Sequence, residues 1–359
     1  MESFNDYILD IGQLHRNVNN IKSIIGCDVK FCAVVKADAY GVGMREVAEV
    51  ICDHIDAFAV ANIDEGIRLR SVSQDKKIIV LGVINLEQIN ACQYYFLSPT
   101  VSTVLEMEKL SRGVKNPLSV EFGLDTGMGR VGFSKKNEIF DAISLIKENS
   151  NLSISGVYSH LATKQNNVEF MIKQRCRFEQ LLEPFDGMNI TRHISNSSAA
   201  WYDDNFNYDM VRVGFGLYGM GEDYDGLKRA IEIVSRVVKI NYVNAGDPVG
   251  YDCSFVAQRD SVIAVLPVGY YDGVSRRLSN RGRVLINGQT AQIVGRICMD
   301  MMMVDVTDIN NVEVGSRVVI IGCDGDEEIT IKEHADIVGT SEYEILSRFN
   351  NSRMNKIIK

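Results

Sequence analysis

The sequence has no surplus of basic residues. Its 359 residues include 38 Lys and Arg against 47 Asp and Glu, which gives a formal net charge of -9. Proteins that bind nucleic acid usually concentrate lysine and arginine into a footprint for the phosphate backbone, and no stretch of this chain does so. We therefore expect no nucleic-acid partner. The net charge does not exclude the binding of small anionic ligands, because a few local groups are enough to hold them.

The sequence also lacks paired cysteines and long apolar segments. No apolar run approaches the roughly 20 residues that a membrane-spanning helix needs, and the first residues show neither the basic nor the apolar region of a signal peptide. We expect a cytoplasmic protein, or the cytoplasmic domain of a membrane protein, with no membrane segment in this chain. The cysteines have no CxxC or metal-site spacing, which is typical of free thiols in a reducing compartment. They lie at positions 27, 32, 52, 92, 176, 253, 298 and 323.

What the sequence does contain is a lysine at the end of an apolar segment. Residues 31–35 predict a buried strand, and Lys36 follows where the strand gives way to a loop of small residues that ends at Gly43. Desolvation there would lower the pKa of the amine and favour a Schiff base with a carbonyl or with pyridoxal phosphate. A surface lysine at the mouth of a strand fits this stretch equally well, so the rest of the chain has to decide.

Strand and helix patterns alternate over the first part of the chain. Eight apolar strand segments, separated by helical patterns, cover residues 31–35, 57–61, 77–81, 97–101, 118–122, 154–159, 191–195 and 210–213. This tally is typical of a (β/α)8 barrel. Beyond about residue 226, strand segments alternate with turn signals and end in a helical tail. We therefore predict an α/β protein with an N-terminal (β/α)8 TIM-like barrel over residues 1–225 and a C-terminal mostly β domain over residues 226–359.

Polar residues fall where the predicted barrel strands end, which is the face on which such barrels place their active sites. The loops after the last two strands offer the Ser197 hydroxyl and backbone N–H groups around Gly214 for a phosphate. Asn-Ser is also a common turn dipeptide, and the glycines would equally relieve crowding. Because both loops lie at the same end of the predicted barrel as Lys36, we favour a phosphate site over ordinary turns. The residues at this face are Lys36, Arg130, His160, Asn196, Ser197, Arg212 and Gly214.

Several motifs occur along the whole chain in a fixed order. They are Val34 to Gly41, Asp125 to Gly132, Ser159-His160, Ser195-Asn196-Ser197, Val211 to Gly214, Val249-Gly250-Tyr251, Val268-Gly269-Tyr270, Gly295 to Asp300 and Glu342-Tyr343-Glu344. On these motifs the chain resembles the alanine racemase family of fold-type III pyridoxal phosphate enzymes. The resemblance implies an isomerase that uses pyridoxal 5'-phosphate to interconvert L- and D-alanine, and so supplies D-alanine for the peptidoglycan of the cell wall.

The resemblance implies catalytic roles for four residues. Lys36 would carry the cofactor and act as the base on one face of Cα, with Tyr251 as the opposing base. Racemisation by such a pair requires both pKa values to be lowered. His160 would hydrogen-bond Tyr251 and help it to ionise, with Arg212 behind. Arg212 would also face the pyridine nitrogen and keep it unprotonated; the alternative is an ordinary clamp for phosphate or carboxylate.

The resemblance also implies a binding set and a homodimer. Arg130 would contact the cofactor's phenolic oxygen and the substrate carboxylate, Met299 would offer its backbone N–H to that carboxylate, and Tyr270 would line the entrance. In the family, Tyr251, Tyr270 and Met299 reach the site from the other subunit, which implies a homodimer with shared active sites. The residues that match the cofactor-binding set are Lys36, Tyr40, Arg130, Asn196, Ser197, Arg212, Gly214, Phe215 and Tyr343.

One position departs from the family pattern. Two residues before Asp125 the family commonly has a lysine, often carbamylated, which holds the arginine corresponding to Arg130; here the position is Gly123. Departures occur in broader-specificity racemases and in the cytoplasmic domains of membrane-bound serine/alanine racemases linked to vancomycin resistance. L-Serine is therefore a second expected substrate, and a serine racemase or a dual serine/alanine racemase is the alternative function.

Three other functions stay open at this stage. A basic amino acid decarboxylase would need an acidic residue in place of Arg212 and a glycine-rich phosphate loop, and the sequence has neither. A non-catalytic pyridoxal phosphate carrier resembles the barrel alone and leaves the second domain without a purpose. A Schiff-base aldolase without cofactor would leave Ser197, Gly214 and Tyr343 needing another phosphate.

Overall fold

The computed structural model describes residues 4–220, 226–349 and 353–359, and the chain divides into two compact units. One unit, called the barrel unit below, comprises His15–Ala39 and Gly43–Leu227. The other, called the β unit, comprises Met1–Leu14, Tyr40–Val42 and Lys228–Lys359. Each unit therefore combines segments that are far apart in the sequence.

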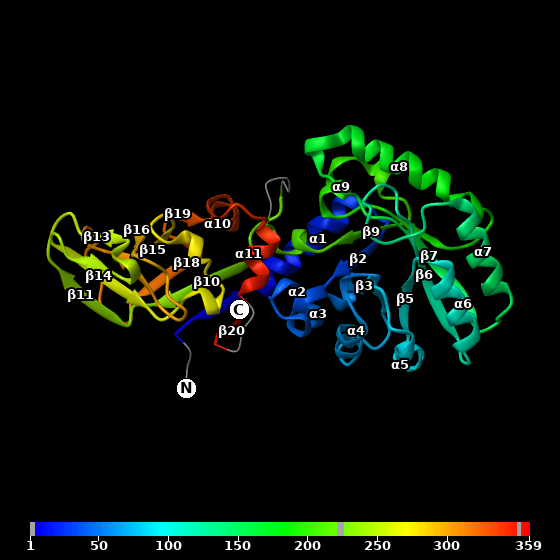
Figure 1. Ribbon diagram of the computed structural model, residues 1–359, viewed down its shortest axis with the longest axis horizontal. Coiled ribbons are helices and arrows are strands. Elements are labelled where there is room, and N and C mark those ends of the chain that lie inside the picture. Colours follow the sequence, from blue (N-terminus) through cyan, green and yellow to red (C-terminus); the bar gives the residue numbers. More distant parts are fainter. Residues whose placement is uncertain (1–3, 221–225, 350–352) are drawn as a thin grey trace. The chain divides into compact units, whose positions relative to one another are not determined.

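The barrel unit is built on parallel strands, of which the described residues form eight, in the order β8-β7-β6-β5-β4-β3-β2-β9 (Figure 1). At the two ends of this order, the Arg212 N–H donates to the Ser195 carbonyl at 3.1 Å and the Asp209 N–H to the Arg192 carbonyl at 3.0 Å. The strands thus form a nearly closed barrel, and the predicted TIM-like fold is confirmed. They are β2 (Lys30–Val34), β3 (Ala57–Val60), β4 (Lys77–Val80), β5 (Leu97–Val101), β6 (Leu118–Gly123), β7 (Leu152–Tyr158), β8 (Thr191–His193) and β9 (Met210–Val213).

Helices fill the connections between the barrel strands. Asn62, Thr103 and Asn167 cap three of them with their side chains, and Thr103 forms a capping box with Glu106. In the part of the chain that the structure describes, no helix is both long and apolar enough to span a membrane. Helix α1 (Ile11–Ile25) precedes the first barrel strand, and the helices between barrel strands are α3 (Met44–Ile51), α4 (Ile63–Arg70), α5 (Ile89–Tyr94), α6 (Val104–Gly113), α7 (Lys136–Lys147), α8 (Val168–Leu182) and α9 (Ser197–Tyr202).

The β unit is built on one large sheet with the order β11-β14-β17-β16-β15-β18-β10-β1-β20, and β19 pairs with β18. Asn287 and Gly288 join β15 and β16 as a two-residue hairpin, and both residues have positive φ as such turns require. The mostly β character predicted for this region is confirmed. Its elements are β1 (Asp6–Leu9), β10 (Ile231–Arg236), β11 (Lys239–Val243), β12 (Pro248–Val249), β13 (Phe255–Val256), β14 (Ser261–Leu266), β15 (Arg283–Ile286), β16 (Gln289–Val294), β17 (Met302–Asp305), β18 (Arg317–Asp324), β19 (Glu327–Ile329), α10 (Ile331–Val338), α11 (Glu342–Arg348) and β20 (Asn355–Ile358).

The observed units differ from the predicted division between residues 225 and 226 at three places. The boundary itself lies after Leu227, so residues 226–227 belong to the barrel unit. β1 belongs to the β unit rather than to the barrel, because it pairs antiparallel with β10 and parallel with β20. Residues 40–42 also belong to the β unit. Residue 225, the last of the predicted barrel domain, lies outside the described residues. Pairing partners, rather than position in the chain, decide where a strand belongs.

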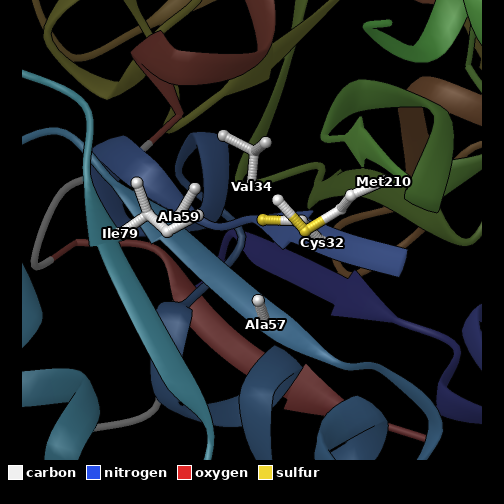
Figure 2. Packing of buried hydrophobic residues seen from close by; sticks show 6 residues of the cluster. All are labelled: Cys32, Val34, Ala57, Ala59, Ile79 and Met210. Carbon is white, nitrogen blue, oxygen red and sulfur yellow. The ribbon is translucent and has the colours of Figure 1, made fainter. Parts of the chain in front are cut away.

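The inner face of the barrel has an apolar side and a charged side. Figure 2 shows the apolar cluster, in which Cys32, Ala57 and Met210 are almost completely buried with neighbours from β2, β3 and β4. Because paired residues of adjacent strands point to the same face, the register places Arg212, Cys32, Ala57 and Lys77 in one row. The apolar cluster thus continues directly into charged side chains inside the barrel.

Candidate active site

Lys36 follows β2 directly, and the backbone after it turns in the left-handed sense. In α2 (Lys36–Tyr40), the φ angles of Ala37, Asp38 and Ala39 are 54°, 52° and 55°, and that of Tyr40 is 63°. For residues other than glycine this conformation costs about 1–2 kcal/mol each. The turn therefore depends on support from its surroundings.

Two carboxyl groups provide that support. The buried Glu65 of α4 accepts the Ala37 N–H and the Ala61 N–H, both at 2.7 Å. Asp38 accepts the Met44 N–H through its side chain at 2.9 Å. The backbone on both sides of the turn is thus held by charge-assisted hydrogen bonds, which are about twice as strong as neutral ones.

Glu65→Gln should destabilise this turn. A carboxylate gives each N–H its own oxygen, whereas the amide has one oxygen, so one of the two donors loses its acceptor. We expect the free energy of unfolding of the cofactor-free protein to fall by about 1–3 kcal/mol in urea denaturation. Asp64→Asn, which neutralises an exposed neighbour on α4, is the control and should change it by less than about 0.5 kcal/mol. Equal stability of both variants would contradict the role of Glu65.

The amine of Lys36 lies half-buried in a positive field. Burial, and after it the charge of Arg130, lower the pKa of Lys36; Glu65 opposes the shift and Arg212 adds to it. A lowered pKa raises the share of neutral amine, which is the form that attacks a carbonyl. The same arginines attract an anionic ligand.

His160 follows β7, as predicted, and is also half-buried. Burial, followed by the charges of Arg212, Arg130 and Lys36, lowers the pKa of His160 to about 3. The ring is therefore neutral near pH 7. A neutral imidazole can accept one hydrogen bond while donating another.

The structure brings together the two loops singled out for phosphate binding. Asn196 caps α9 by accepting the Ala199 N–H at 3.1 Å, and the Ser197 hydroxyl accepts the Gly214 N–H at 3.2 Å. A Cβ on Gly216 would lie 3.4 Å from the Ser197 side chain. The hydroxyl and the N–H groups of this close approach are suitable donors for a phosphate.

Arg212 on β9 is only 4% exposed, and its guanidinium is held on several sides. The Nη2 group donates to the carbonyls of Ser159 at 2.6 Å and Ile194 at 3.3 Å. The Nη1 group donates to the His193 carbonyl at 3.0 Å and to the His193 ring at 2.8 Å. Among the contacts of the described residues, none uses the Nε–H of Arg212. That group is the donor which Arg212 can offer to a ligand.

The sequence pattern does not single out the residues around Arg212. It predicts only strands for the segments that contain His193 and Glu121, and both side chains are fully buried. Tyr158 lies under the guanidinium at 5.1 Å from Cζ to ring centre. A signal for Glu121 was present, because it is a charged residue between Val120 and Phe122 in a buried strand. A charge at such a position needs a partner inside the barrel.

The structure gives a physical reason for glycine at position 123. A Cβ there would lie 3.1 Å from the Thr100 side chain and 3.9 Å from the Tyr158 ring, whose hydroxyl is 3.0 Å from that of Thr100. This pair therefore fills the space that a longer side chain at position 123 would enter. Arg130 itself is exposed, at the end of a turn held by the Asp125 carboxylate.

The remaining predicted site residues lie in the β unit. Tyr251, Tyr270 and Met299 are 65%, 42% and 56% exposed. The Tyr270 N–H donates to the Cys298 carbonyl at 3.0 Å, so Tyr270 and Met299 lie on neighbouring loops. The rings of Tyr40 and Tyr343 are 6.1 Å apart, and burial, followed by Tyr343, raises the pKa of Tyr40.

A nearly closed barrel with a lysine at the end of its first strand, joined to a β domain, defines the fold-type III pyridoxal phosphate enzymes. Family models agree, since "Alanine racemase, N-terminal domain" matches residues 9–222 and "Alanine racemase, C-terminal domain" matches residues 230–358. The chain belongs to the alanine racemase family.

Individual relatives cover almost the whole chain. The alanine racemase of Halothermothrix orenii is 36% identical over 351 residues, which are 94% of this chain and 92% of the relative. The alanine racemase structure from Bartonella henselae, with covalently bound pyridoxal phosphate, has a TM-score of 0.88 at 25% identity and covers all of both chains. A histidine racemase from Leuconostoc mesenteroides has a TM-score of 0.91 at 27% identity, covering 100% of this chain and 98% of that one.

Proposed function

We propose that this chain is a pyridoxal phosphate-dependent alanine racemase with Lys36 and Tyr251 as its two bases. The observation that carries the proposal is the half-buried Lys36 amine at the end of β2, with its lowered pKa, in the same unit as Arg130, Arg212 and the contact between Ser197 and Gly214. These groups fit the cofactor: an amine for its aldehyde, donors for its phosphate and an arginine Nε–H for its ring nitrogen. When bound, the cofactor supplies the electron sink that makes the Cα proton acidic.

The chain's own residues supply binding and proton transfer. Lys36 would hold the cofactor through its Nζ and would move the Cα proton on one face. Tyr251 moves the proton on the other face, with the neutral His160 ring as its hydrogen-bond partner. Arg130 and the Met299 N–H hold the substrate carboxylate. Arg212 keeps its own proton, so the ring nitrogen that it faces stays unprotonated.

We infer that two copies of the chain form a homodimer with shared active sites. The exposure of Tyr251, Tyr270 and Met299 on neighbouring loops of one unit supports this, because a second copy would cover them. Each subunit would then provide Lys36 to its own site and Tyr251 to the partner's site. A monomer would lack one base.

The cellular role that we propose is cytoplasmic supply of D-alanine for peptidoglycan. All eight cysteines are free, which supports a reducing compartment. Serine is the second candidate substrate, because the glycine at position 123 departs from the pattern of the alanine racemase family. A related fold that racemises histidine indicates that the fold alone does not set the substrate.

Chiral analysis of product from L-alanine and L-serine, incubated in parallel with the purified protein and cofactor, tests the function. We expect D-alanine, with a kcat/KM at least about tenfold above that for serine, because no partner for the serine hydroxyl is established at the site. Comparable or faster conversion of serine would make the protein a serine/alanine racemase. Absence of a D-isomer from either substrate would contradict the proposed function.

A further inference from the structure

Four charged or polar side chains form a continuous series across the barrel interior. Lys77 Nζ lies 2.5 Å from Glu121 Oε1, and Glu121 Oε2 lies 3.0 Å from His193 Nε2. His193 Nδ1 lies 2.8 Å from Arg212 Nη1. Glu121 and His193 are fully buried. The series runs from β4 through β6 and β8 to β9, and it ends at the arginine assigned to the cofactor's ring nitrogen.

The contacts determine where the protons lie. A guanidinium can only donate, so His193 Nδ1 accepts from Arg212 and carries no proton. The proton of the neutral ring is then on Nε2, and Nε2 donates to Glu121. Burial lowers the pKa of His193 to about 4; Glu121 opposes this shift, and Arg212 and Lys77 add to it, so the ring is neutral. Burial raises the pKa of Glu121, but His193 and Lys77 outweigh it and bring it to about 2.

The local backbone is shaped around the Glu121 carboxylate. The register of β6 and β7 shifts between Val120 and Glu121, which leaves Ser155 as the extra residue of a bulge. The Ser155 hydroxyl donates to Glu121 Oε1 at 2.8 Å. A Cβ on Gly156 would lie 2.3 Å from Glu121 Oε2, so the carboxylate fits only beside a glycine. Bulges commonly re-aim a side chain, and here the bulge supplies both a donor and the space.

We propose that Glu121 is a positioning residue for racemisation, which acts through His193 to fix the direction in which Arg212 presents its Nε–H. With Nδ1 held unprotonated, His193 binds one Nη1 hydrogen, and the nearby carbonyls bind the other Nη hydrogens. The Nε–H is thereby left for the cofactor. The part that concerns the cofactor rests on the proposed function, whereas the proton arrangement within the protein does not.

The variant Glu121→Gln tests this arrangement. Lys77 can only donate, so the new amide oxygen turns to Lys77 and the NH2 group faces His193 Nε2. His193 then has to accept at Nε2 and carry its proton on Nδ1, where it opposes Arg212. Ser155→Ala is the matched control, because it removes a partner of the same carboxylate and leaves its charge and its bond to His193.

The first measurement uses the cofactor-free protein, with 15N-labelled histidine and the His193 signal assigned through His193→Gln. We expect the Nε2–H form in the wild type and in Ser155→Ala, and the Nδ1–H form in Glu121→Gln. In the loaded enzyme we expect kcat of Glu121→Gln to fall about 10- to 100-fold, the usual range for losing the partner that orients a histidine, with a smaller change in KM. The absorption band of the bound cofactor should shift, because its ring nitrogen loses a fixed donor.

Lys77→Met keeps the proposal testable if Glu121→Gln does not fold. It leaves the carboxylate to accept from His193, so the Nε2–H form should persist and kcat should fall less than about threefold. A large loss of kcat with an unchanged tautomer would overturn the proposal. So would an unchanged tautomer, kcat and absorption band in Glu121→Gln. If the tautomer switches as expected but the wild type forms no D-alanine, the proton arrangement stands and the proposed function fails.

Discussion

Lys36→Ala should reduce D-alanine formation by at least about 10³-fold, because it removes both the covalent attachment of the cofactor and one of the two bases. Chiral chromatography of the product measures the loss, and the absorption spectrum of the purified variant reports whether cofactor is still held. Lys30→Ala is the matched control. It removes an exposed lysine from the opposite end of the same strand, and it should leave both readouts unchanged.

A second substitution separates the chemistry of Lys36 from its charge. Lys36→Arg keeps a positive group near Arg130 and Arg212, but a guanidinium does not lose its proton near neutral pH and cannot attack the aldehyde. We expect it to be as inactive as Lys36→Ala. Activity close to that of the wild type would show that Lys36 acts only as a charge, and this would reject the proposed mechanism.

Tyr251→Phe should reduce interconversion about 10²- to 10⁴-fold, the usual contribution of a positioned acid–base group. Lys36 remains, so cofactor binding should persist, and one enantiomer of alanine should still exchange its Cα hydrogen with deuterated solvent. The other enantiomer should not exchange. Tyr242→Phe, at a tyrosine that is 85% exposed on β11, is the control. Equal loss of exchange for both enantiomers would contradict a base on each face.

Mixing the two inactive variants tests the shared site. If Lys36 and Tyr251 come from different subunits, a dimer of one Lys36→Ala and one Tyr251→Phe chain has one intact site. Random reassociation should therefore restore about a quarter of the wild-type activity. No recovery after subunit exchange, verified by mass, would place both bases in one chain or exclude the dimer.

The barrel strands were predictable because each is a short apolar run between polar or helical segments. The same pattern predicted Lys36 and His160 just after strands, and they follow β2 and β7. Arg212 lies within β9, and Arg130 lies beyond β6, after the turn held by Asp125. The left-handed turn after Lys36 was not predictable. Its residues, Ala37 to Tyr40, include no glycine, and the energetic cost of their left-handed conformation is offset only by contacts such as that from Glu65.

The series of side chains from Lys77 to Arg212 could not be predicted from the sequence for a different reason. The donor and the space that Glu121 has inside the barrel depend on a bulge at Ser155 of β7, and periodicity cannot locate a one-residue insertion. Nothing in the sequence distinguishes His193 from other strand residues, because its partners Glu121 and Arg212 lie on other strands. The predicted roles of Tyr251, Tyr270 and Met299 come from the family resemblance, and they remain predictions until the variants above are measured.

The pairing of β1 also governs the order in which the chain can assemble on the ribosome. The Asn5 side chain accepts from the Ser235 hydroxyl 230 residues later, and Asn355 donates to Asp6 across 349 residues. Most barrel strands pair with the next strand along the chain, so they can form during synthesis. β1 is synthesised well before β10 and β20, so its edges stay open until those partners have been made. Long-range pairings of this kind are slow and prone to aggregation, so the pairing of β1, rather than barrel formation, should limit the yield of folded protein.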